Sequence, residues 1–186
     1  MFRSVLIVPA VLASFLTGCS SVVLPTAVQM RSVSPLDADP ADYEIALDLP
    51  NGLDLQPGSE QLRLSATRSD TRAELGQTFV LERRAASNGA PEADGRLAFY
   101  RVAPADLPRF RLLQADIAEM KQAAPDATKG SLSISLQGCR LGEGPSSEAT
   151  GAVWIRTVRE SPFLPLVRNG PVDKLLQAED LMPCDG

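Results

Sequence analysis

The stretch from Gly130 to Gly138 reads GSLSISLQG and alternates apolar with polar side chains. The apolar positions are Leu132, Ile134 and Leu136, and the polar ones are Ser131, Ser133, Ser135 and Gln137. A period of two places these two sets on opposite faces of a β-strand. The stretch therefore predicts a strand that has one face in the core and the other in water.

Similar patterns outside this stretch predict further strands. They cover Tyr43 to Leu49, Glu60 to Arg68, Leu75 to Arg84, Arg96 to Val102 and Ala152 to Arg159. In the first of these, the apolar side chains of Tyr43, Ile45, Leu47 and Leu49 share one face. The loop Ser87 to Gly95 joins the third segment to the fourth, and this arrangement predicts a hairpin.

The last of these segments has apolar residues on both faces. Val153, Ile155 and Thr157 alternate with Trp154, Arg156 and Val158. The single tryptophan of the chain, Trp154, therefore either packs in the core under the helix or presents a surface to a partner, and we expect the core position.

The period changes between Asp106 and Ala123, where apolar residues recur every three or four positions. They are Leu107, Phe110, Leu113, Ile117 and Met120, followed by Ala124. This spacing predicts an amphipathic helix. Asp106 is expected to cap its N-terminus, Pro108 is tolerated in the first turn, and Pro125 ends the helix. Because its polar face mixes both charge signs, we expect the helix to pack on a sheet rather than lie on a membrane.

The tail from Ser161 to Gly186 carries Pro162, Pro165, Pro171 and Pro183. Proline cannot donate to a strand ladder, so the tail is expected to pair only at a sheet edge and to form a short helix after Pro171. The whole pattern predicts a mainly β fold, an antiparallel β-sandwich-like domain of about six strands with one amphipathic helix. The alternative is an α+β sheet covered by the helix.

The N-terminus has the pattern of an export signal. Arg3 precedes an uncharged run from Val5 to Leu16, and the small residues Thr17 and Gly18 follow it. This run is shorter than the roughly 20 residues of a membrane-spanning helix, and Pro9 interrupts it. We therefore expect a secretory signal that is removed.

The end of this signal, Leu16-Thr17-Gly18-Cys19, resembles the lipobox of bacterial lipoproteins. The resemblance implies cleavage between Gly18 and Cys19, with a diacylglycerol on the Cys19 thiol and further acylation of the new amino group. Two or more acyl chains hold a protein stably at a bilayer. By analogy with lipoproteins of bacteria that have two membranes, Ser20 favours the outer membrane.

The resulting domain plan has three parts: a lipoprotein signal peptide over residues 1–18, a lipidated N-terminus and tether over 19–42, and a single globular domain over 43–186. The tether contains Pro25, Pro35 and Pro40 and ends in three acidic residues, Asp37, Asp39 and Asp42. Because this stretch lacks the turn glycine and the terminal glutamate of an EF-hand loop, it is interpreted as a solvated linker rather than a calcium site.

Composition excludes several kinds of function. The net charge is −5 and no dense Lys/Arg cluster occurs, which argues against nucleic acid as a partner. The chain contains no histidine, so a Ser-His-Asp or Cys-His arrangement is excluded.

With Cys19 assigned to lipid by the resemblance, Cys139 and Cys184 remain. In an oxidising envelope such a pair is expected to form a disulfide. A redox-active or metal-binding pair is disfavoured, because the two cysteines are far apart and lack CxxC spacing.

No catalytic, cofactor-binding or metal-binding residue is predicted. The sequence has no GxSxG elbow, GxxxxGK[ST] phosphate loop or SxxK motif, and the loop at Gly142 to Pro145 is explained by a turn between strands. We therefore expect a lipid-anchored envelope protein that faces the periplasm from the outer membrane. Its domain is expected to be non-enzymatic and to bind an envelope protein partner. The alternatives are a cell-wall or polysaccharide hydrolase with a carboxylate pair and a binder of small apolar ligands.

Overall fold

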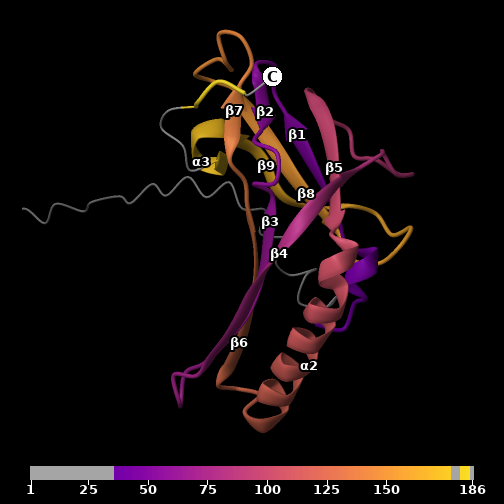
Figure 1. Cartoon of the computed structure of the whole chain (residues 1–186), viewed down its shortest axis with the longest axis vertical. Helices are drawn as coiled ribbons and strands as arrows, with labels where there is room; N and C mark the ends of the chain where they lie inside the picture. The colour runs from indigo at the N-terminus through magenta and orange to yellow at the C-terminus, as the bar shows by residue number, and fades with distance from the viewer. Residues whose placement is uncertain (1–35, 177–180, 185–186) are drawn as a thin grey trace, which may run out of the picture.

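The computed structural model describes residues 36–176 and 181–184, and its main element is a seven-stranded antiparallel sheet (Figure 1). The strands lie in the order β6-β3-β4-β5-β1-β8-β9. Their bounds are β1 Glu44–Leu49, β3 Gln61–Arg68, β4 Glu74–Arg84, β5 Arg96–Val102, β6 Thr128–Ser135, β8 Thr150–Arg156 and β9 Leu164–Pro171. Two short strands, β2 Leu53–Leu55 and β7 Gly138–Arg140, form a second sheet. The mainly β, antiparallel fold with one main helix is thereby confirmed.

The sheet is curled because the long strand β4 changes partner along its length. Its first part, from Glu74 to Val80, pairs with β3, whereas Leu81 to Arg84 pair with β5. The expected hairpin between β4 and β5 is therefore present, but only the end of β4 takes part in it. In Figure 1 the strands β3, β4 and β6 extend beyond the rest of the sheet, and the small sheet lies at the opposite end of the molecule.

Helix α2, Leu107–Ala123, packs on β3, β4 and β6 and closes the main core. Phe110 is completely buried, 4.5 Å from the ring of Phe79 and 5.4 Å from that of Tyr43 between ring centroids. Leu113 and Ile117 are buried on the same side of the helix. Three- and four-residue spacing produces this apolar stripe, as the sequence predicts.

Asp106 stands at the N-cap of α2, as expected, but its side chain makes no capping hydrogen bond. One of its carboxylate oxygens accepts from the backbone N–H of Val80 at 2.9 Å, and the other accepts from Arg109 at 2.9 Å. A short 3-10 turn, η2 (Pro104–Asp106), leads into the helix. Asp106 therefore joins the helix to β4 instead of satisfying the first turn.

The opposite face of the sheet is also covered, so β1 is buried on both sides. Ala46, Phe99, Ala152 and Trp154 form a second buried cluster there, with Trp154 only 7% exposed. Trp154 is buried, as expected, but the expected place under the helix is wrong, because Trp154 packs on the face away from α2. The β4–β5 loop over residues 85–95 reaches this face, since the N–H of Gly95 donates to Asp48 at 2.9 Å.

The residues just before β1 belong to the packed structure. Leu36 and Ala38 pack against the main core, and Pro40 is buried within the 3-10 turn η1, Pro40–Asp42. Asp39 caps this turn and pairs with Arg111 of α2 at 2.9 Å. Residues 36–42, which the sequence pattern assigns to the tether, are therefore part of the domain surface.

The C-terminal part forms an edge strand, as the prolines predict. Among the residues that the structure describes, strand β9 pairs with β8 alone, through an irregular register, and the short helix α3, Val172–Leu176, follows Pro171. Beyond it, Cys184 is bonded to Cys139 of β7.

Candidate functional site

A row of alternating charges crosses four adjacent strands on the face away from α2. Glu82 of β4 lies opposite Arg101 of β5, Arg101 opposite Glu44 of β1, and Glu44 opposite Arg156 of β8. Opposite charges at directly paired positions attract each other across a sheet. The row therefore reinforces the strand register at the end of the sheet where β5 leads toward α2.

The centre of this row is buried. The side chains of Glu44 and Arg156 are 6% and 7% exposed, and both Arg156 and Arg84 form ion pairs with the Glu44 carboxylate. The hydroxyl of Ser87 donates to Glu44 at 3.1 Å and accepts from Arg156 at 2.9 Å. Buried charges need partners of this kind, because their removal from water is costly. Glu44 is therefore held rigidly by three groups.

Arg156 connects this centre to two loops. Its guanidinium donates to the backbone carbonyls of Asn88, at 3.1 Å, and Ser161, at 3.5 Å, and lies 4.5 Å from the ring centroid of Phe163. Its Nε is the one buried side-chain nitrogen or oxygen without a hydrogen-bond partner in the described ranges. Since Arg156 touches both the β4–β5 loop and the segment after β8, it fixes the walls of the depression between them.

That depression is a groove of about 490 Å³, which we call the arginine groove. Its lining residues are Ala41, Asp42, Glu44, Arg84, Ala86, Ser87, Asn88, Arg101, Arg156, Arg159 and Glu160. Arg101 and Arg159 stand at its surface with side chains 48% and 76% exposed. Four arginines thus face three carboxylates in a chain whose net charge is −5.

Each exposed arginine has fewer described partners than the buried Arg156 has. Arg101 is 3.7 Å from Glu82, which is beyond hydrogen-bonding distance. Arg159 donates through Nε and Nη2 to Asp42 at 3.1 and 3.0 Å. Exposed pairs of this kind contribute only about 0–1 kcal/mol. Their guanidinium groups can therefore change partner at little cost.

The carboxylates of the groove bear on the hydrolase alternative. Sugar hydrolysis by a carboxylate pair requires one carboxyl group that gives a proton to the leaving group. Glu44 instead accepts from two guanidinium groups, and Asp42 accepts from Arg159. Two of the three carboxylates that line the groove are thus engaged as acceptors for arginines.

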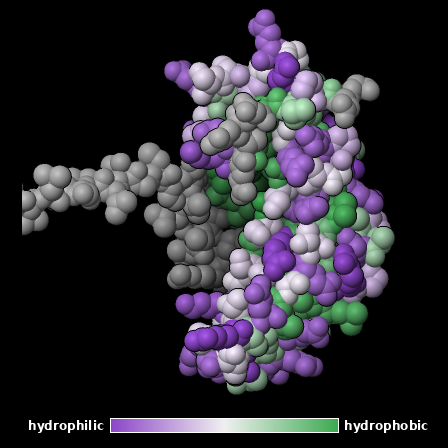
Figure 2. Space-filling view, turned by 60° about the vertical axis from the view of Figure 1, so that its left-hand side comes forward, coloured by the Kyte–Doolittle hydropathy of each residue, from purple (hydrophilic) through white to green (hydrophobic). Residues whose placement is uncertain are grey.

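A second depression, of about 620 Å³, lies between β6, α3 and the loop after β2. Figure 2 turns this side of the molecule toward the viewer and shows apolar side chains in a hollow in its upper half. The lining mixes aliphatic side chains, such as Leu136, Leu175 and Met182, with hydroxyl and amide groups. No charged residue of the described ranges lines it.

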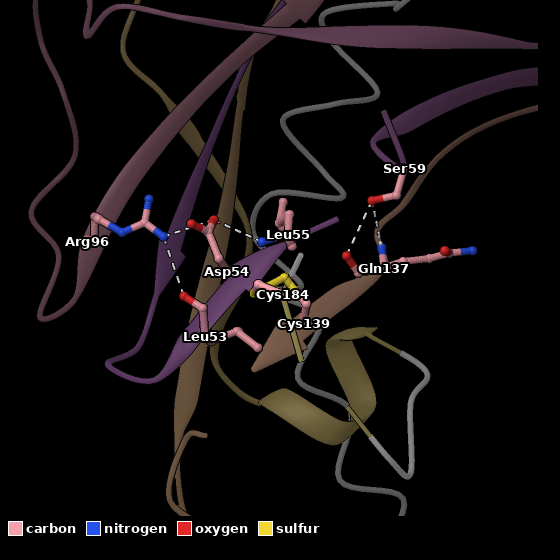
Figure 3. Close-up of a disulfide and its surroundings, with 8 residues drawn as sticks. All are labelled: Leu53, Asp54, Leu55, Ser59, Arg96, Gln137, Cys139 and Cys184. Carbon is pink, nitrogen blue, oxygen red and sulfur yellow. Dashed lines mark hydrogen bonds and ion pairs between the residues drawn. A yellow bond between two sulfur atoms is a disulfide. The ribbon is translucent and has the colours of Figure 1, made fainter. Parts of the chain in front are cut away.

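Polar contacts lie on both sides of the disulfide between Cys139 and Cys184 (Figure 3). Arg96 forms an ion pair with Asp54 at 2.9 Å and donates to the carbonyl of Leu53 at 3.4 Å. Burial opposes ionisation of Asp54, but hydrogen bonds from Arg96 and the Leu55 N–H outweigh it and lower its pKa. Ser59 donates to the carbonyl of Gln137 at 3.3 Å across the two segments.

The structure brings together one pair of the predicted site residues. Cys139 and Cys184 form a disulfide with an S–S distance of 2.05 Å. The predicted cleavage and lipidation residues, Gly18 and Cys19, lie outside the described residues. Within residues 36–176 and 181–184, no group of His, Cys, Asp and Glu residues is suited to hold a metal ion. The same residues contain no helix that is long and apolar enough to cross a membrane.

The sequence patterns do not identify the arginine groove. Arg156 stands in a strand segment that is otherwise rich in apolar residues, and this position is the one available signal of a buried ion pair. Its partner, Glu44, lies more than a hundred positions earlier in the chain, so the pairing depends on strand order.

No protein-family model matches the chain, and no curated protein or solved structure is significantly similar to it.

Proposed function

We propose that the protein is an outer-membrane lipoprotein, anchored through Cys19, whose domain binds another component of the envelope without catalysing a reaction. The proposed recognition surface is the arginine groove. The lipid anchor rests on the resemblance of Leu16-Thr17-Gly18-Cys19 to a lipobox.

One observation carries the binding role: the walls of the groove are fixed before any ligand arrives. The Glu44–Arg156 pair is buried, and Arg156 contacts the β4–β5 loop and the segment that follows β8. A preorganised site loses less conformational entropy on binding than a mobile one. The exposed guanidinium groups of Arg101 and Arg159 then supply the donors that meet a partner.

The position of the groove fits a tethered domain. Leu36, the first described residue, packs against the core, and Ala41 and Asp42, a few positions later, line the groove. The predicted tether therefore joins the domain within a few residues of the proposed recognition surface.

The anchor is tested by comparing the wild-type chain with Cys19→Ser. The wild type should incorporate labelled palmitate and sediment with outer membranes, whereas Cys19→Ser should do neither. Sedimentation of both proteins with membranes, without label in either, would contradict the lipid anchor.

The binding role is tested by affinity capture from solubilised envelopes. The Arg101→Glu/Arg159→Glu variant should lose components that the wild type retains. Arg63→Glu is the matched control, because Arg63 is an exposed strand arginine paired with Glu74 and lies outside the groove. Turnover of peptidoglycan or polysaccharide by the purified chain, with no groove-dependent capture, would overturn the proposal in favour of a hydrolase.

A further inference from the structure

We infer that the arginine groove binds a phosphate group, held by the guanidinium groups of Arg84, Arg101 and Arg159. The inference rests on the proposed function for the location of the recognition surface and adds the chemistry of the ligand.

Each of these three arginines comes from a different part of the fold. Arg84 ends β4, Arg101 lies in β5, and Arg159 follows β8. All three line the same groove of about 490 Å³. A phosphate group accepts hydrogen bonds from several directions through its oxygens, and guanidinium groups are the side chains best suited to donate them.

The arginines retain donors for such a ligand. Arg84 uses Nη1 for Glu44 and Nε for the carbonyl of Ala85, which leaves its Nη2 without a described partner. Arg159 uses Nε and Nη2 for Asp42, which leaves Nη1. Arg101 is too far from Glu82 for a hydrogen bond.

The buried carboxylate of Glu44 determines how charge is distributed in the site. Glu44 already accepts from Arg84 and Arg156, so one negative charge is built into the floor below two guanidinium groups. With Asp42 and Glu160, which also line the groove, three carboxylates face four arginines, so the lining as a whole keeps one net positive charge. An anionic ligand would therefore be held mainly by the guanidinium donors that the protein's own carboxylates leave unused.

Among the carboxylates near the groove, two lie beside arginines that would hold the ligand, and their removal gives the inference a diagnostic sign. Glu82 faces Arg101, and Asp42 holds Arg159. Neutralising either one frees a guanidinium group without removing a donor. Glu82→Gln and Asp42→Asn should therefore bind phosphate more tightly than the wild type does, an effect that damage to the fold would not produce.

The test is calorimetric titration of the full chain, solubilised in a nonionic detergent, with sodium pyrophosphate. We expect binding that weakens about tenfold in Arg101→Ala and in Arg159→Ala, because each variant loses a hydrogen bond between charged groups. Glu82→Gln should strengthen it several-fold, and Arg63→Ala should leave it unchanged. Raised salt should weaken it, since the rim is exposed.

Two further titrations distinguish the sources of a phosphate group. Short-chain phosphatidylglycerol that binds more tightly than pyrophosphate, and displaces it, would identify a lipid headgroup. Inorganic phosphate or pyrophosphate binding without any phosphatidylglycerol binding would identify a free phosphate. Short-chain phosphatidylcholine serves as the control for the acyl chains.

The inference is overturned if pyrophosphate does not bind at millimolar concentration, if Arg63→Ala weakens binding as much as Arg101→Ala does, or if Glu82→Gln fails to strengthen it. These results are separable from those for the proposed function. Phosphate binding without capture of any envelope component would support the phosphate site and contradict the proposed function. Capture that depends on the groove, without phosphate binding, would support the proposed function and contradict the phosphate site.

Discussion

Replacement of Glu44 with glutamine should destabilise the fold strongly. The substitution preserves the size of the side chain but removes the charge that pairs with Arg156, whose side chain is only 7% exposed. A buried charge that loses its partner typically costs about 3–5 kcal/mol of folding free energy. Because Arg84 is more exposed and recovers some hydration, we expect the lower end of this range, about 3 kcal/mol.

The matched control is Glu82→Gln. Glu82 belongs to the same charged row, but its side chain is 46% exposed and lies 3.7 Å from Arg101. Loss of such a surface charge should change the free energy of unfolding by about 0.5 kcal/mol or less. The same chemical change at two positions of one row thus isolates the effect of burial.

A double variant separates the ion pair from its surroundings. Glu44→Met/Arg156→Met removes both charges, and replacement of a whole buried pair by apolar residues is often close to neutral. The double variant should therefore be more stable than the sum of its two single variants implies.

Urea unfolding followed by the fluorescence of Trp154 measures these changes. Trp154 is the only tryptophan and is buried on the same face of the sheet as Glu44, so its emission reports on this region. The slope of the unfolding free energy against urea concentration should be the same for the wild type and the variants. An unchanged slope means that the surface exposed on unfolding is the same, so the midpoints report stability alone. If Glu44→Gln is as mild as Glu82→Gln, the buried ion pair does not stabilise the fold as argued.

Three further predictions concern stability. Cys139→Ser should lower the free energy of unfolding by about 4 kcal/mol by loop-closure entropy, and a reducing agent should lower the wild type to the same value in urea unfolding. The lowered pKa of Asp54 means that its ionised form favours the fold above the pKa of the unfolded chain, near 4, and that this contribution is lost as pH falls through the folded pKa. Asp54→Asn should therefore lower the melting temperature at neutral pH and have no effect in strong acid; an equal loss at both pH values would contradict the ion pair with Arg96. Phe110→Ala should destabilise by about 3–5 kcal/mol because it empties the contact between α2 and the sheet, while Leu112→Ala, at a position 67% exposed on the same helix, should change the unfolding midpoint little.

Local patterns in the sequence predict most of the elements. Alternation identifies β1, β3 and β6, and the three- and four-residue spacing identifies α2, because each pattern reflects one face packed against a core. The prolines at 165 and 171 predict an edge strand for a different physical reason, because proline has no N–H group to donate to a neighbouring strand. These features depend on near neighbours alone.

The arrangement of the elements depends on distant contacts, which such patterns do not contain. The segment of β4 looks like one strand, yet it pairs with β3 along its first part and with β5 along its last. The loop over residues 85–95 looks like a simple connection, yet it covers a second apolar cluster. The alternation in β1 therefore predicts its inner face but not the burial of the other.

The arginine groove follows from the same distant contacts. Glu44 and Arg156 become neighbours only because β1 lies between β5 and β8. Charged residues in separate strands predict solvated faces when each strand is considered alone. Only the strand order places Arg84, Arg101 and Arg159 around one volume.

Site-specific crosslinking in living cells tests the central claim, that the arginine groove is the recognition surface of an anchored envelope protein. A photoreactive side chain at Asn88, an exposed residue of the groove, should give a discrete product with an envelope component after irradiation. The product should disappear when Arg101→Glu and Arg159→Glu are added, and the same side chain at the exposed Leu112 of α2 should not give it. Equal products from both positions, or a product from Leu112 alone, would contradict the account.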